Sequence, residues 1–97
     1  MPKAIFDFSY EAREDLFRIW NYGADIWGEE AANQYYLKLH RHFEQLAEEP
    51  FLYPEVAHLG EGYRRSICEN EVIYYRIVDK GIFIMAIIGR QDITRRL

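Results

Sequence analysis

The stretch Glu-Val-Ile-Tyr-Tyr-Arg-Ile-Val-Asp at residues 71–79 decides the fold class of this 97-residue chain. Its β-branched and aromatic residues are typical of a strand, and similar runs at 63–68 and 82–89 stand on either side. Glu69-Asn70 and Lys80-Gly81 separate the runs, which is the spacing of tight hairpin turns. The sequence therefore predicts a meander of three antiparallel strands. The last two are apolar on both faces, so one face packs on the helices and the other needs a further cover, for which a partner is one candidate.

Two successive helices are predicted upstream of these strands. Ser9 has the side chain of a helix N-cap, and the acids that follow it are favourable at the positive end of a helix dipole. Gly28 interrupts the helical spacing of apolar residues, which then resumes until Pro50 forbids its continuation. So short a connection folds the pair into an antiparallel hairpin. The apolar stripe of the first helix comprises Ala12, Leu16, Ile19, Trp20, Gly23 and Trp27, with Phe17 and Ala24 beside it.

The fold class expected from these elements is α+β. A run at 3–9 supplies an opening strand, so the order is β-α-α-β-β-β, with the first strand joining the sheet beside the last. Residues 50–62 carry two prolines and two glycines, and we expect a packed loop there. A hydrophobic share of 49% and a length of 97 residues match one small domain, residues 1–97.

Charge is divided unevenly along the chain. Residues 1–60 hold five basic and eleven acidic side chains, whereas residues 61–97 hold seven basic and five acidic ones. A net charge of −4 does not fit a polycation that coats nucleic acid, and any cationic role falls to the second segment. The lone Cys68 has no thiol to pair with, the longest apolar run is seven residues, and the start lacks a secretory signal. We therefore expect a cytoplasmic protein without a membrane span.

The familiar catalytic and ligand-binding motifs are missing from the sequence. His40 and His42 lie two positions apart on a helix, so their side chains point apart and cannot share a metal ion. His58 stands alone in the loop, and neither serine lies in a nucleophile elbow. Acidic and basic residues alternate on the helices, as on a solvated face. We expect neither a metal site nor a cofactor.

Arginines of the predicted sheet are the best candidates for a functional site. Arg64 and Arg65 belong to the first strand of the meander, Arg76 belongs to the second, and Arg90 follows the last. A cluster of guanidinium groups binds the phosphates of a nucleic acid or an acidic protein surface. The structural alternative is cross-strand ion pairing with Glu69, Glu71 or Asp79. The sequence leaves both alternatives open.

Three segments of the second half resemble a known family. They are Gly-Tyr-Arg-Arg-Ser-Ile at 62–67, Val-Ile-Tyr-Tyr-Arg-Ile-Val at 72–78 and Ile-Ile-Gly-Arg-Gln-Asp at 87–92. Together with the upstream β-α-α order, they resemble the RelE/ParE superfamily of bacterial toxins from type II toxin–antitoxin modules. The resemblance covers nearly the whole chain and implies the α+β fold given above.

RelE-like members of this superfamily are ribosome-dependent mRNA endonucleases, which is one function that the resemblance implies. Its catalytic residues here would be Arg65, Arg76 and Arg90, which would neutralise the scissile phosphate. The expected proton-transfer residues are missing, because many relatives carry His where this chain has Ile88, and the tail 93–97 has no Tyr or His. The phosphates of ribosomal RNA would also repel the acidic helices.

The ParE-like branch resembles this sequence more closely. It implies a toxin that inhibits DNA gyrase by protein binding, without turnover or direct sequence-specific contact with nucleic acid, and that a ParD-type antitoxin neutralises. The tail carries toxicity in this branch, so the implied target-binding residues are Arg90, Gln91, Asp92, Arg95 and Arg96. The antitoxin would cover apolar surface, with candidate contacts at Phe17, Trp20, Ala24, Arg64 and Arg76. Phe17 and Trp20 could instead belong to the toxin's own core.

Overall fold

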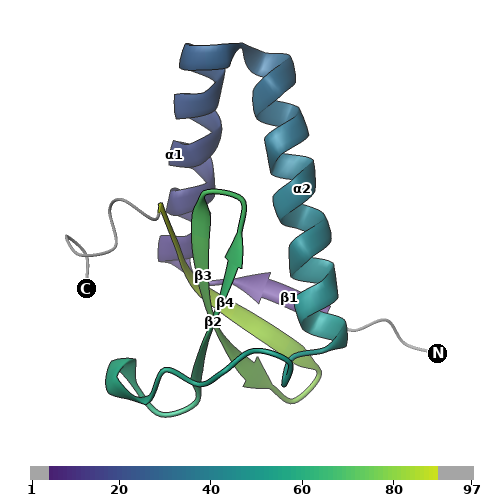
Figure 1. Ribbon diagram of the computed structural model, residues 1–97, viewed down its shortest axis with the longest axis vertical. Helices are drawn as coiled ribbons and strands as arrows, with labels where there is room; N and C mark the ends of the chain where they lie inside the picture. The colour runs from purple at the N-terminus through teal and green to yellow at the C-terminus, as the bar shows by residue number, and fades with distance from the viewer. Residues whose placement is uncertain (1–4, 90–97) are drawn as a thin grey trace.

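The computed structural model describes residues 5–89 and has the α+β architecture expected from the sequence (Figure 1). Two long helices stand against one face of a small sheet, and the elements follow the predicted β-α-α-β-β-β order. They are β1 (Ile5–Phe8), α1 (Tyr10–Trp27), α2 (Glu29–Glu48), the 3₁₀ turn η1 (Ala57–Leu59), β2 (Tyr63–Cys68), β3 (Glu71–Val78) and β4 (Gly81–Gly89). Neither helix of the described part is apolar enough over a sufficient length to cross a membrane.

The sheet has the strand order β1-β4-β3-β2. β2, β3 and β4 form the predicted antiparallel meander. β1 pairs in parallel with β4, from Ile5 opposite Gly81 to Phe8 opposite Ile84, so the expected place of the first strand is confirmed. At Gly81 the strands lie so close that a Cβ atom would stand 1.7 Å from the Ile5 carbonyl oxygen. Only glycine therefore allows β1 to dock at this position.

Capping residues bound the helical hairpin where the sequence predicts them. The Ser9 side chain accepts a hydrogen bond of 3.0 Å from the Ala12 backbone N–H and thereby begins α1. Gly28 alone separates the helices, with a φ of 96° that residues with a side chain rarely adopt. α2 ends at Glu48, two residues before Pro50. Figure 1 shows the two helices antiparallel and side by side.

The main core lies between the hairpin and one face of the sheet. α2, β3 and β4 supply most of its large, fully buried side chains, which include Leu39, Phe43, Leu46, Ile73, Ile82, Ile84 and Ile87. Tyr75 lies among them and donates a hydrogen bond of 2.8 Å to the Pro50 carbonyl oxygen. Burial raises the pKa of Tyr75 to about 12. This bond ties the end of the hairpin to the centre of the sheet.

The far end of the hairpin extends beyond the sheet (Figure 1). Trp27, predicted to belong to the buried stripe of α1, is 68% exposed there, with Tyr22 packed edge-to-face on its ring. Nearer the sheet, Ala12 is fully buried, and Leu16 and Ile19 pack against the core. The prediction for Trp27 is therefore wrong, because the helical spacing continues past the sheet that buries the rest of the stripe.

Residues 50–62 form the predicted loop, and it is packed in part. Tyr53 and Leu59 lie against the two apolar clusters and Val56 is buried, whereas Phe51 and Leu52 are exposed. The segment follows the edge of β2, where the Val56 N–H donates to the Tyr63 carbonyl oxygen at 2.7 Å. An edge strand that is paired in this way cannot recruit other chains at that position.

The face of the sheet turned away from the helices carries a second, smaller apolar cluster. Val72, Tyr74 and Ile88 are buried there, with Leu59 and Ala86 packed against them. The strands are thus apolar on both faces, as predicted, and Leu59 of η1 supplies part of the second cover. We call this side of the sheet the open face.

Candidate functional site

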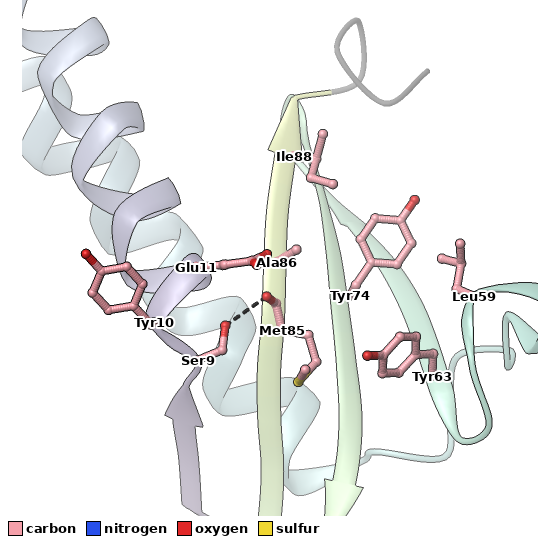
Figure 2. A pocket seen from close by; sticks show the side chains of 9 residues that line it. All are labelled: Ser9, Tyr10, Glu11, Leu59, Tyr63, Tyr74, Met85, Ala86 and Ile88. Carbon is pink, nitrogen blue, oxygen red and sulfur yellow. Dashed lines mark hydrogen bonds between the residues drawn. The ribbon is translucent and has the colours of Figure 1, made fainter. Parts of the chain in front are cut away.

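A pocket of about 460 Å³ lies on the open face, beside the start of α1 (Figure 2). Side chains from α1, η1 and the meander line it, together with the residue that caps α1: Ser9, Tyr10, Glu11, Leu59, Tyr63, Tyr74, Met85, Ala86 and Ile88. Its wall is mainly apolar and aromatic, with one carboxylate. Concave sites of this composition are where proteins commonly bind ligands or the side chains of partners.

An irregularity in β4 shapes the middle of this pocket. Tyr74 pairs with Ala86 and Tyr75 pairs with Ile84, so the register skips Met85. The Ser9 hydroxyl donates to the carbonyl oxygen of Met85 at 2.8 Å (Figure 2). Because the same side chain caps α1, one serine fixes the start of the helix against the bulge. The sequence indicates the cap but not this second bond, since the two residues lie 76 positions apart.

Tyr74 has an unsatisfied hydroxyl in the wall of this pocket. The residue is 3% exposed, and its hydroxyl oxygen has no hydrogen-bond partner among residues 5–89. Its ring lies between Leu59 and Ile88 (Figure 2). A buried polar group without a partner costs about 1–3 kcal/mol, so its retention calls for an explanation such as a ligand. Sequence reasoning missed this residue as a site candidate, although its position two residues before Arg76 places both on one face of a strand.

The strand arginines divide between the two faces of the sheet. Ser66 bonds to His42 of α2, so its side chain points toward the helices. Because side chains alternate along a strand, Arg64 shares that side, whereas Arg65 points to the open face. This division was predictable in principle from the fact that Arg64 and Arg65 are neighbours on one strand.

Two arginines, Arg65 and Arg76, accompany Tyr74 on the open face. Arg65 lies directly opposite Tyr74 in the β2–β3 register, and Arg76 follows Tyr74 by two residues on β3. The guanidinium carbon of Arg76 lies 5.7 Å from the centre of the Tyr63 ring, which is a cation–π contact. We call Arg65 and Arg76 the open-face arginines. Both are exposed.

Arg64 holds the segment that precedes β2. Its guanidinium donates to the Tyr53 carbonyl oxygen at 2.6 Å, lies 3.5 Å from the Glu55 carboxylate, and stands 5.1 Å from the centre of the Phe51 ring. The hypothesis of a single arginine cluster is therefore wrong. Arg64 and the open-face arginines lie on opposite sides of the sheet and cannot hold the same group.

Two of the three acids expected to pair with the strand arginines, Glu69 and Glu71, have other contacts. Glu69 lies 3.8 Å from the ammonium group of Lys38, and Glu71 accepts a hydrogen bond of 2.8 Å from the Tyr35 hydroxyl. On β2, Arg64 forms an ion pair, and its partner is Glu55 of the preceding segment. Within residues 5–89 the open-face arginines form no ion pair, so the open face keeps an excess of positive charge beside the pocket.

The hairpin carries large apolar side chains that remain exposed. Phe17 is 69% exposed, so the alternative that placed it in the core is wrong. Trp20 is half-buried and donates from its Nε1–H to the Asn33 side-chain oxygen at 2.8 Å, and Ala24 is also half-buried. We call the following exposed set the hairpin surface: Phe17, Tyr22, Ile26, Trp27, Tyr36 and Leu37. They are distributed around both helices, and Phe17 and Ile26 lie on opposite sides of α1, so one partner segment would cover only part of the set.

The histidines have structural contacts. His42 Nε2 and Ser66 Oγ share a hydrogen bond of 2.6 Å, and burial lowers the pKa of His42. Ser66 is buried, so this pair joins α2 to β2 inside the protein. His40 lies 3.9 Å from the Glu44 carboxylate, and His58 is exposed in η1. Over the described ranges no three potential ligands come together in a way that could hold a metal ion.

The target-binding candidates and one catalytic candidate lie outside the described residues. They follow the end of β4 at Gly89 and are Arg90, Gln91, Asp92, Arg95 and Arg96. Their roles stay predictions. Of the candidate antitoxin contacts, Phe17, Trp20 and Ala24 lie on α1, whereas Arg64 and Arg76 lie on the two sides of the sheet.

Known proteins with similar sequences are toxins. Residues 6–94 match the family described as the ParE toxin of type II toxin–antitoxin system, parDE. The chain is 35% identical over 72 residues to Toxin ParE1 of Caulobacter vibrioides, which covers 74% of this chain and 75% of that protein. It is 26% identical over 88 residues to Toxin ParE1 of Mycobacterium tuberculosis, covering 89% of this chain and 90% of the relative.

The fold is also found in a solved structure, the chromosomal ParDE TA system from P. aeruginosa. The two chains superimpose with a TM-score of 0.68 at 20% identity, over 90% of this chain and 96% of the other. The hairpin on a four-stranded sheet is thus shared, and the sequence match runs through the hairpin and the meander alike. The chain belongs to the ParE toxin family of type II toxin–antitoxin systems.

Proposed function

We propose that this protein is a growth-inhibiting, cytoplasmic toxin that binds DNA gyrase and is neutralised by a ParD-type antitoxin. The observation that carries the antitoxin part is the hairpin surface, where large apolar side chains of both helices remain exposed. An amphipathic partner segment that covered part of them would remove apolar area from water. Membership of the parDE family supports the type of partner.

The first helix supplies the antitoxin contacts in this proposal. Phe17, Trp20 and Ala24 are spaced by three and four residues, so they lie along one side of α1. Phe17 is the most exposed of the three, and the partner would bury most of its ring and the remaining edges of the other two. On the sheet, Arg76 is exposed and is our candidate for an acidic group of the partner. Arg64 would act indirectly, by holding the segment beside β2.

Gyrase would be inhibited by binding alone, with the tail as the contact. Residues 90–96 contain three arginines, and they come directly after the end of β4 at Gly89. Guanidinium groups suit a surface that carries carboxylates or the phosphates of bound DNA. In this proposal the module stabilises the plasmid or chromosome segment that encodes it, because cells that lose the antitoxin stop growing.

One observation favours the alternative of ribosome-dependent RNA cleavage. Arg65 and Arg76 lie together on the open face beside a pocket, as residues that neutralise a phosphate would. Against it, Ile88 is buried in the small apolar cluster at the position where many relatives carry the expected His. Burial of an apolar side chain there leaves the pocket wall without that proton donor.

A supercoiling assay with purified DNA gyrase tests the proposed target. The protein is titrated into the assay with and without its antitoxin, and cleaved DNA is measured alongside supercoiling. We expect inhibition with accumulation of cleaved DNA, relieved by the antitoxin. Supercoiling that continues at high excess of folded protein would exclude gyrase, and translating ribosomes would be tested next.

Two sets of variants separate the functions. Deletion of residues 93–97 is expected to abolish gyrase inhibition, while circular dichroism shows the fold retained, because the described core ends at β4. Arg65→Ala and Arg76→Ala are expected to leave gyrase inhibition intact. The reverse pattern, in which the arginine variants lose toxicity and the deletion keeps it, would support RNA cleavage.

A further inference from the structure

We propose that the open-face pocket anchors an acidic segment of the antitoxin, by seating one apolar side chain and binding an adjacent carboxylate at Tyr74 and Arg76. This inference rests on the proposed function, because the antitoxin is the partner it names. It adds a second contact, on the opposite side of the sheet from the helical hairpin.

The first support is the buried Tyr74 hydroxyl. Tyr74 lines the pocket, and its hydroxyl finds no hydrogen-bond partner within the described part of the chain. The hydroxyl can donate to a ligand oxygen, and its ring lies against Leu59 of the irregular segment before β2 (Figure 2). Two other aromatic rings, Tyr10 and Tyr63, line the same pocket.

The second support is the charge around this hydroxyl. Arg65 stands opposite Tyr74 across the β2–β3 ladder, and Arg76 stands two residues along β3 on the same face. Both are exposed and form no ion pair within residues 5–89. Two guanidinium groups on the face that carries the pocket are complementary to a partner segment with carboxylates.

The third support decides between a peptide and a nucleic acid. Leu59, Met85, Ala86 and Ile88 give the pocket an apolar wall that fits an aliphatic or aromatic side chain. A polyanion also requires more cations than the two that residues 5–89 place on this face. A peptide with one apolar and one acidic residue side by side meets all of these conditions.

The test measures binding of the antitoxin to three toxin variants by isothermal titration calorimetry. Tyr74→Phe removes the hydroxyl alone, and we expect the dissociation constant to rise about tenfold. The free variant should also melt a few degrees higher than wild type, since a buried unpaired hydroxyl is gone. A purely structural tyrosine would not combine tighter folding with weaker binding.

The charge partner is tested with a matched pair. Arg76→Gln should weaken binding by a similar factor and flatten its dependence on salt. Lys80→Gln makes the same change of charge in the β3–β4 turn, away from the pocket, and should leave the dissociation constant unchanged. Heteronuclear NMR spectra of each variant establish that the fold is intact.

The outcomes distinguish this inference from the proposed function. If wild type binds the antitoxin and Tyr74→Phe and Arg76→Gln bind equally well, the pocket is not the anchor, although the antitoxin remains the partner. If the antitoxin does not bind wild type at all, the proposed function and this inference both fail. If the same two variants instead lose binding of a single-stranded RNA oligonucleotide, the pocket serves a nucleic acid and the inference is overturned.

Discussion

Asp15 of α1 accepts a hydrogen bond of 2.9 Å from the backbone N–H of Ile87 in β4. Its carboxylate is nearly buried, with the residue 4% exposed, and the second oxygen accepts from the Arg18 guanidinium at 2.8 Å. The charge pattern of α1 predicted a solvated face for its acids, and for Asp15 that prediction is wrong. The Asp15 carboxylate binds the N–H of Ile87, which lies two residues after the bulge at Met85. This bond holds α1 against the bulged part of β4.

Asp15→Ala is therefore expected to lower the free energy of unfolding by about 2–3 kcal/mol, because it leaves the Ile87 N–H buried without its acceptor. Urea denaturation followed by circular dichroism measures this change. Glu14→Ala is the control, since Glu14 is an exposed acid at the neighbouring position, and it should change stability by less than about 0.5 kcal/mol. Equal effects of the two substitutions would contradict the role given to Asp15.

The His42–Ser66 contact predicts a stability that depends on pH. Burial lowers the pKa of His42 below its ordinary value of 6.5, so the unfolded chain takes up a proton before the folded one does. Stability is complete above pH 6.5 and should decline as the pH falls from 6.5 toward the lower folded pKa. Melting temperatures recorded across this interval measure the decline.

Glutamine variants isolate this contribution. His42→Gln keeps a hydrogen-bonding side chain but cannot be protonated, so the decline over this interval should become shallower. His58→Gln changes an exposed histidine in η1 and should keep the wild-type profile. A slope that is the same in both variants would assign the pH dependence to other groups.

Neighbouring arginines on β2 are expected to differ in their effect on stability. Arg64→Ala should lower the free energy of unfolding by about 1–2 kcal/mol, because the Tyr53 carbonyl loses its charged donor and the Phe51 ring loses its contact. Arg65→Ala removes an exposed side chain and should change it by less than about 0.5 kcal/mol. Urea titrations of both variants measure these free energies of unfolding. If the Arg65 variant were as unstable as the Arg64 variant, the two arginines would not differ in burial and contacts as described.

Phe17 is expected to matter for binding and not for folding. Phe17→Glu should weaken antitoxin affinity at least about tenfold, because it places a charge in an apolar contact, while the melting temperature stays near that of wild type. Leu52→Glu makes the same kind of change at an exposed position of the segment before β2, and it should leave the affinity for the antitoxin unchanged. Loss of affinity in both variants would indicate a general effect of added negative charge.

Local signals in the sequence predicted most of the fold. Ser9, Gly28 and Pro50 bound the helices, and the β-branched and aromatic content of the last three runs, with turn residues between them, is enough to specify the meander. Trp27 misled the prediction, because a helical period does not reveal how far the neighbouring sheet extends. The loop at 50–62 was predicted from turn residues, which indicate irregular structure but do not reveal that Phe51 and Leu52 remain exposed while Val56 is buried.

The candidate site was harder to predict because its contacts are distant in sequence. Period-two alternation alone could have separated Arg64 from Arg65. By contrast, the bond from Ser9 to Met85 and the unpaired hydroxyl of Tyr74 depend on a bulge that leaves no signature in the composition of β4. Buried polar contacts between remote elements arise from packing, so they become visible only in three dimensions.

The parallel pairing of β1 with β4 fixes the order in which the molecule can be completed during translation. β1 begins at Ile5, yet its partner begins at Gly81, so the ribosome must deliver nearly the whole chain before the sheet can close. The two helices are neighbours in sequence, so they can contact each other before β3 and β4 have been made. A nascent toxin therefore displays its hairpin surface before its open face exists. An antitoxin that binds the hairpin first can bind the nascent toxin at the ribosome, before the finished toxin has been released.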